Sequence, residues 1–251
     1  MNNLSRMNAK PVPLSPQTPA TFPRATTGLT AVEVGIFAAL HAAIVEQRLL
    51  PGTRLIEEEL AAIYRTSRMR IRRVLLALAH EGVIALPPGR GAQVACPSVE
   101  DAKSVFQARR LIEAGLIEAP GAALAPPAIA ALRQCLRAET AANQVHDRAG
   151  MIAQSGLFHL ELARGLGNPV IADIVSTLVS RSSLIIALFQ RNSAVCCRLD
   201  EHAVLIEALE AGRFGPAAVL MRDHLDAIEA GLDIEVKPGV PNDLRAILAR
   251  T

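Results

Sequence analysis

Three chain breaks divide residues 29–94 into a pattern that few folds satisfy. Apolar residues recur at helical spacing before the first break, at Pro51-Gly52, and on both sides of the second, at residues 65–67. The third break is the Pro- and Gly-rich turn at residues 87–91, and it separates two short runs with strand character. The expected elements are helices over residues 29–49, 57–64 and 68–81 and strands over residues 83–86 and 92–94. This order predicts a winged helix-turn-helix.

The helix after the three-residue turn begins with an unusual concentration of positive charge. Five arginines fall within nine residues: Arg65, Arg68, Arg70, Arg72 and Arg73. Cations at a helix N-terminus oppose the helix dipole, so this placement favours a partner that supplies negative charge, such as the phosphates of DNA. A solvated helix end is the alternative. The opposite face carries an apolar stripe that would anchor the helix: Ile71, Val74, Leu75 and Leu78.

Composition favours packed helices. Aromatic residues make up 3% of the chain and Trp is absent, whereas Ala, Leu, Ile and Val dominate. No apolar run approaches the roughly 18 residues of a membrane span, and the N-terminus lacks the pattern of a secretory signal. We therefore expect a mostly α, cytoplasmic protein with no membrane partner. Basic residues outnumber acidic ones by 8 to 6 in residues 28–95, while acidic residues lead by 16 to 12 in residues 96–234.

These patterns predict four segments. Residues 1–27 hold five prolines among small and polar residues, which is typical of a disordered Pro-rich tail. Residues 28–95 are expected to form the winged helix-turn-helix, residues 99–234 an all-helical bundle, and residues 235–251 a C-terminal tail. The four cysteines lack the spacing of a zinc motif and are expected to be reduced thiols: Cys96, Cys135, Cys196 and Cys197.

Three histidines of the second segment, His159, His202 and His224, lie on apolar faces of three separate predicted helices. A single such histidine is ordinarily a hydrogen-bonded core residue. Three in one domain have the residue type and the number that a divalent metal site uses. Spacing alone leaves both interpretations open.

Residues 51–94, PGTRLIEEELAAIYRTSRMRIRRVLLALAHEGVIALPPGRGAQV, resemble the DNA-binding domain of the GntR superfamily of bacterial transcriptional regulators. The pattern of that domain runs PGxxLxExxLAxxLGVSRTPVREALxxLxxEGLV, followed by a wing that ends RGxxV. The resemblance implies that Arg68, Met69 and Arg72 contact DNA and that the wing residues Arg90 and Gly91 meet the minor groove or the backbone. Arg90 as a simple turn residue is the alternative.

This sequence departs from the family pattern at three positions. Met69-Arg70 stands in place of Thr-Pro, and Arg73 stands in place of Glu. Since Met69 lacks the hydrogen-bonding group of Thr, the departure implies an altered operator preference. Arg70 and Arg73 either add phosphate contacts or are ordinary solvated arginines.

The second segment is similar to the all-helical FCD domain of the FadR-type subgroup, on the strength of LFHLELARGLGNPVI, DEHAVLIEALEAGRFGPAAVLMRDHL and ARRLIEA. Many such domains bind a divalent metal through one Asp and three His, and a small carboxylate effector completes the coordination. The resemblance implies that His159, His202 and His224 bind zinc or nickel. Ser155 occupies the position of the Asp, and a serine is a weaker ligand than a carboxylate. An effector pocket without metal is therefore the alternative.

Two arginines of this segment are candidates for further roles. Arg181 matches a position that often faces the effector pocket, so we expect it, with Ser155, to contact the effector carboxylate. A surface salt bridge is the alternative for Arg181. Arg109 and Glu113 are four residues apart on a predicted helix and are expected to form a structural pair.

Taken together, these features predict a homodimeric, ligand-responsive transcriptional regulator. We expect a repressor that a small carboxylate releases from an inverted-repeat operator in double-stranded DNA. A metal-dependent enzyme using the three histidines is the main alternative, although no general base is placed near them. A nonspecific architectural DNA binder is another, and it would leave the large helical segment without a role.

Overall fold

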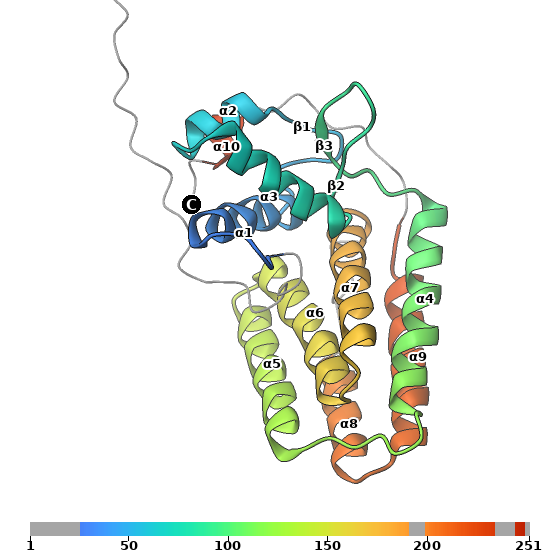
Figure 1. Cartoon of the computed structure of the whole chain (residues 1–251). Coiled ribbons are helices and arrows are strands. Elements are labelled where there is room, and N and C mark those ends of the chain that lie inside the picture. The colour runs from blue at the N-terminus through green and yellow to red at the C-terminus, as the bar shows by residue number, and fades with distance from the viewer. Residues whose placement is uncertain (1–25, 191–198, 234–243, 249–251) are drawn as a thin grey trace, which may run out of the picture.

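The computed structural model describes residues 26–190, 199–233 and 244–248. A small helix-turn-helix unit lies against one end of a bundle of longer helices (Figure 1). This confirms the expected fold class, which was mostly α with an N-terminal winged helix-turn-helix and an all-α bundle after it. The expected Pro-rich tail, residues 1–27, falls outside the described residues except for Thr26 and Thr27.

The N-terminal unit is built from short helices around a small sheet. Its elements are α1 (Ala31–Val45), β1 (Arg54–Leu55), α2 (Glu57–Ile63), α3 (Arg68–His80), β2 (Ile84–Ala85) and β3 (Ala92–Val94). Ser67 caps α3 by accepting a hydrogen bond from the backbone N–H of Arg70. Thr30 and Glu33 form a capping box at the start of α1, so each side chain satisfies a backbone donor of the other residue.

The sheet has one strand more than the hairpin expected from the sequence. β3 lies in the centre and pairs antiparallel with both β1 and β2. Because β1 contains only Arg54 and Leu55, it is too short to show strand alternation. In the wing between β2 and β3, Gly89 and Gly91 both have φ of 72°, which glycine adopts without strain, and exposed Arg90 lies between them.

Residues 99–230 contain longer helices that pack as a closed ring (Figure 1). They are α4 (Val99–Ile117), α5 (Pro126–Gln144), α6 (Arg148–Gly165), α7 (Pro169–Phe189), α8 (Leu199–Glu210) and α9 (Phe214–Ala230). Each packs against the next in the order α4, α7, α6, α5, α8, α9, and α9 packs against α4. The inside of the ring is therefore enclosed by helices from every part of the segment.

Helix α7 is long and apolar enough to cross a membrane by length and composition alone. Its sequence is not an uninterrupted apolar run, because Asp173 and Arg181 divide the segment. In the fold, 67% of the most apolar 18-residue stretch of this helix is buried. It also packs against α4, α6 and α1. These contacts identify α7 as a core helix that joins the bundle to the N-terminal unit.

The expected C-terminal tail, residues 235–251, includes a short helix, α10 (Leu244–Leu248). Leu244 and Leu248 are buried in the core of the N-terminal unit, where α10 packs against α1 and α2. The end of the chain thus returns to the helix-turn-helix. A single apolar turn has too little periodicity to be predicted from sequence.

Two of the four cysteines fall in the described residues, and both are free thiols, as expected. Cys96 is exposed, while Cys135 is buried, and burial raises the pKa of its thiol to about 11. Cys196 and Cys197 lie outside the described residues.

Candidate functional site

The start of α3 presents an exposed, positively charged face. Arg68, Met69, Arg70 and Arg72 are all exposed, and Met69 reaches 76% exposure. The expected anchor stripe is buried on the other side of the helix: Ile71, Val74, Leu75 and Leu78. An exposed apolar residue among arginines at a helix N-terminus is suited to a groove that offers both phosphates and base edges.

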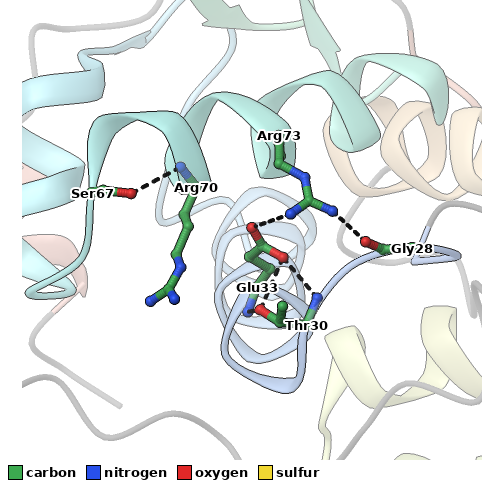
Figure 2. Close-up of polar contacts among 6 residues, drawn as sticks. All are labelled: Gly28, Thr30, Glu33, Ser67, Arg70 and Arg73. Carbon is green, nitrogen blue, oxygen red and sulfur yellow. Dashed lines mark hydrogen bonds and ion pairs between the residues drawn. The ribbon is translucent and has the colours of Figure 1, made fainter.

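Arg73 differs from these neighbours because, although half exposed, it bonds to two residues of the N-terminal unit. Its guanidinium donates to the Glu33 carboxylate at 3.1 Å and to the carbonyl oxygen of Gly28 (Figure 2). The backbone N–H of Thr30 holds the pKa of buried Glu33 below its usual value, against the effect of desolvation, and the Thr30 hydroxyl and Arg73 act in the same direction. The Arg70 side chain points away from this pair in Figure 2. Both added arginines are exposed, and Arg73 has a structural role as well, through its bonds to Glu33 and Gly28.

His159, His202 and His224 come together inside the ring, from α6, α8 and α9. All three are buried, and one ligand nitrogen from each lies within 4.8 Å of the others. The Nε2 atoms of His159 and His224 are 3.3 Å apart. Two nitrogens bound to one tetrahedral zinc ion would be about 3.3 Å apart, given bonds of about 2.0–2.1 Å. The convergence that spacing left open is thus present in the fold.

A different glutamate fixes each histidine ring through Nδ1. The pairs are His159 with Glu113 at 2.6 Å, His202 with Glu139 at 2.8 Å and His224 with Glu201 at 2.8 Å. Because the carboxylates accept these hydrogen bonds, each Nδ1 carries the proton and each Nε2 directs a lone pair toward the centre. Phe158 also stacks on His202, with ring centroids 4.1 Å apart.

Because the protons are on Nδ1, the Nε2 atoms of these rings cannot donate hydrogen bonds to one another. In the part of the chain that the structure describes, His202 Nε2 is buried and has no hydrogen-bond partner. Burial lowers the pKa of His159 to about 3 and lowers that of His224, so these two rings stay neutral at physiological pH. Three nitrogen donors with carboxylates behind them fit a divalent cation such as zinc.

Arg109 and Glu113 form the expected pair, with 2.6 Å between Nε and Oε1, and both are buried. Burial opposes ionisation of Glu113, but the charge of Arg109 and the hydrogen bonds from His159 and Arg109 outweigh it and hold its pKa at about 2. Arg109 Nη1 donates to Ser182 of α7 at 3.0 Å. Its Nη2 is buried without a partner among the described residues. The pair is thus part of the histidine centre, and Arg109 retains a donor suited to an anion.

The two residues expected to contact the effector lie in different places. Ser155 is buried in α6, one turn before His159. The Arg181 guanidinium lies 3.9 Å from the Asp101 carboxylate, and the side chain packs against Gly82, just after α3. These contacts place Arg181 at the junction of the bundle with the N-terminal unit, and they correspond to the salt-bridge alternative.

Sequence reasoning did not identify the three glutamates or the unpartnered donor of Arg109. A weak signal was available, because Glu139 continues the apolar face of Leu132 and Cys135 at spacings of three and four. An acidic residue in such a stripe suggests a buried partner. Nothing local indicates which histidine that partner is.

Comparison with known protein families matches both halves of the chain. Residues 33–94 match the gntR family of bacterial regulatory proteins, and residues 104–227 match the FCD domain. A transcriptional regulator of the helix-turn-helix type from an unstable DNA locus of Streptomyces ambofaciens is 26% identical over 194 residues, which is 77% of this chain and 81% of the relative. The regulator LutR of Bacillus subtilis is 25% identical over 203 residues, covering 72% of this chain and 92% of the relative.

Solved structures show the same fold. A GntR transcriptional regulator from Rhodococcus superimposes with a TM-score of 0.68 at 23% identity, over 80% of this chain and 97% of the other. McbR (YncC) of E. coli superimposes with a TM-score of 0.66 at 19% identity, again over 80% and 97% of the two chains. The two-part architecture is therefore shared at low sequence identity.

Proposed function

Since this chain is a DNA-binding transcriptional regulator of the GntR family, with a C-terminal FCD domain, we propose that it is a repressor which a small carboxylate effector releases from its operator. The family consists of transcriptional regulators, so the metal-dependent enzyme is no longer an alternative. One observation carries the proposal: a single chain joins an exposed arginine helix to a buried centre of three histidines.

We assign DNA binding to residues 28–95. Arg68 and Arg72 would reach bases or phosphates in the major groove, with Met69 and Arg70 beside them, because all four are exposed at the start of α3. The Arg68 guanidinium lies 3.9 Å from the Glu57 carboxylate. An ion pair this open to solvent is too weak to prevent such DNA contacts. Arg90 and Gly91 at the wing tip would contact the minor groove or the backbone. This role places the protein in the cytoplasm with its DNA.

We assign effector binding to residues 99–234. His159, His202 and His224 would hold a divalent ion, zinc or nickel, through their Nε2 atoms. The bound ion would attract and orient a carboxylate oxygen. Ser155 lines this region of α6 without adding negative charge, which leaves the anionic ligand position to the effector.

The chemical class of the effector follows from the charges at the centre. Arg109 Nη2 is a buried donor with no partner among the described residues, and a small carboxylate would satisfy it. An apolar effector would leave this group unpaired, which is unfavourable in a buried site. We therefore propose Arg109 as a contact of the effector carboxylate, in addition to the expected contacts of Ser155 and Arg181.

We further propose that the protein is a homodimer, which an inverted-repeat operator requires. The outer face of α4 and α7 exposes Leu111, Val170 and Ile174. Val170 and Ile174 are four residues apart, so they lie on the same face of α7, and α7 packs beside α4, which carries Leu111. A second copy of the chain would bury this face.

The test is a mobility-shift titration of the full-length protein on DNA from upstream of its own gene, at fixed salt. We expect a shifted complex that zinc together with a small dicarboxylate or hydroxycarboxylate dissociates. Sequence-selective binding that no metal and no carboxylate in the panel affects would contradict the release mechanism. Equal binding to every DNA fragment would instead favour the architectural alternative.

A further inference from the structure

Within three consecutive residues, α7 contacts both the recognition helix and the histidine centre. Ser180 Oγ donates to the carboxylate of Glu81, the C-cap residue of α3, at 2.5 Å. Ser182 Oγ accepts from Arg109 at 3.0 Å. The side chain of Arg181, between them, packs against Gly82. Residues two apart on a helix point to opposite sides, so this turn of α7 lies between the two functional regions.

On the side of the histidines, the contact is part of an unbroken chain of hydrogen bonds. Arg109 donates from Nη1 to Ser182 and from Nε to Glu113 Oε1, at 3.0 and 2.6 Å. Glu113 Oε2 accepts from His159 Nδ1 at 2.6 Å. Each of these side chains is at most 3% exposed, so water does not replace a displaced partner. A change at His159 therefore has to be accommodated by Arg109 and Ser182.

On the side of α3, the Ser180 hydroxyl has two possible acceptors. Glu81 Oε2 lies at 2.5 Å and the Ser176 carbonyl oxygen lies at 3.1 Å. One O–H group donates to only one of them at a time, so the bond to α3 competes with a bond inside α7. The Ser180 hydroxyl thus has two alternative bonds available, one to α3 and one within α7, which a coupling element could use.

We propose that Ser180 and Ser182 are positioning residues that couple occupancy of the histidine centre to the orientation of α3. This rests on the proposed function, because it needs a ligand at that centre. The Nδ1–H···Glu113 bond of His159 would become stronger if its Nε2 held a cation, and the Glu113 carboxylate would then be drawn away from Arg109. Arg109 would then move relative to Ser182. The hydroxyl of Ser180, two residues earlier on α7, would exchange its hydrogen bond between Glu81 and the Ser176 carbonyl oxygen.

The test uses the full-length protein with zinc chloride as the probe, and with chelator as the zinc-free state. Zinc affinity is measured by competition with a chromophoric chelator. Hydrogen–deuterium exchange of residues 78–84 reports on the end of α3, and the ratio of operator affinities with and without zinc reports on coupling. The variants are Ser180→Ala and Ser182→Ala. Ser176→Ala is the matched control, because that buried hydroxyl of α7 has no partner among the described residues. Ser182→Thr restores a hydroxyl.

We expect the four variants to bind zinc as the wild type does. Zinc should change exchange at residues 78–84 and operator affinity by about fivefold or more in the wild type, Ser176→Ala and Ser182→Thr. In Ser180→Ala and Ser182→Ala the affinity ratio should fall to about one. A wild-type ratio in both alanine variants would overturn the coupling role while leaving the regulator function intact. Zinc binding with no response in the wild type itself would also overturn the coupling role, while release by zinc together with a carboxylate is tested separately by the mobility-shift titration.

Discussion

Arg73 of α3 and Glu33 of α1 form an ion pair at 3.1 Å, and the Glu33 side chain has no exposed surface. Arg73→Ala leaves this covered carboxylate with only its Thr30 partners, and removes a link between two helices of the core. We expect the free energy of unfolding to fall by about 1–2 kcal/mol, since Arg73 is itself half exposed and solvent screens part of the pair. Urea denaturation measures this loss.

Arg70→Ala is the matched control for this pair, because the exposed Arg70 side chain acts on Glu33 only through its charge, as the last and smallest of the effects on that carboxylate. We expect Arg70→Ala to keep wild-type stability. Equal stability of the two variants would show that the Arg73–Glu33 contact contributes nothing.

Removing Arg68 and Arg72 should weaken DNA binding without affecting the fold. Both are exposed, so Arg68→Ala/Arg72→Ala should melt at the wild-type temperature. Loss of two cationic contacts should lower operator affinity by about tenfold or more and reduce the slope of log affinity against log salt by about one to two. Fluorescence anisotropy at several salt concentrations measures both. Arg137→Ala removes an exposed arginine on α5 and should change neither the affinity nor the slope. Wild-type operator affinity of the double variant would show that this face of α3 does not bind DNA.

The fold was largely predictable because its signals are local. Pro51-Gly52, the Ser67 cap and the glycines of the wing each act within a few residues, and the structure has an element boundary near each. The elements that were not predicted, β1 and α10, are too short to carry periodicity. Both are stabilised by partners distant in sequence: β3 for the first, and α1 and α2 for the second.

The histidine centre was predictable only in part. Three histidines on apolar faces indicated a possible cluster, and the structure brings them together. Their glutamate partners come from three different helices, and such pairings depend on how α4, α5 and α8 pack, which one sequence does not contain. The surroundings of Arg109 and Arg181 were not predictable for the same reason. Both carry the same charge, and only packing distinguishes a buried arginine from one at a junction.

Metal affinity should depend on the carboxylates behind the histidines. In Glu139→Gln the amide is a poorer acceptor for His202 Nδ1, which makes the ring a weaker ligand, so zinc affinity should fall about 10- to 100-fold. Competition with a chromophoric chelator gives the value. Glu207→Gln, an exposed carboxylate of α8, serves as the control and should bind zinc as the wild type does. Ser155→Asp should bind zinc more tightly than the wild type, and weaker binding would place Ser155 away from the ion.

The exposed face of α4 and α7 should be sensitive to charge if it is a dimer interface. Leu111 is 71% exposed, so Leu111→Glu is not expected to disturb the folded monomer. At an apolar interface the carboxylate would be desolvated, and the dimer dissociation constant should rise by about tenfold or more. Sedimentation velocity measures this. Val219→Glu on α9 makes the same kind of change at a residue that is 50% exposed, and it should leave assembly unaltered. If Leu111→Glu assembles as the wild type does, this face is not the dimer interface.

Glu81 should make the stability of the protein depend on pH. Burial raises its pKa above the ordinary value of 4.5, and the bond from Ser180 opposes this only in part. The folded protein therefore keeps the Glu81 proton at pH values where the unfolded chain has lost it. The stabilisation from this proton is fully present below pH 4.5, and it is lost as the pH rises through the folded-state pKa.

Glu81→Gln keeps the shape of the protonated side chain and cannot ionise. We expect its melting temperature to match that of the wild type at pH 4 and to exceed it at pH 8, because only the wild type then has to bury a charge. Thermal denaturation across this range gives the difference curve, and Glu58→Gln, on an exposed glutamate of α2, controls for the lost charge. A Glu81→Gln protein that melts below the wild type at pH 8 would show that the ionised carboxylate, held by Ser180, stabilises the junction.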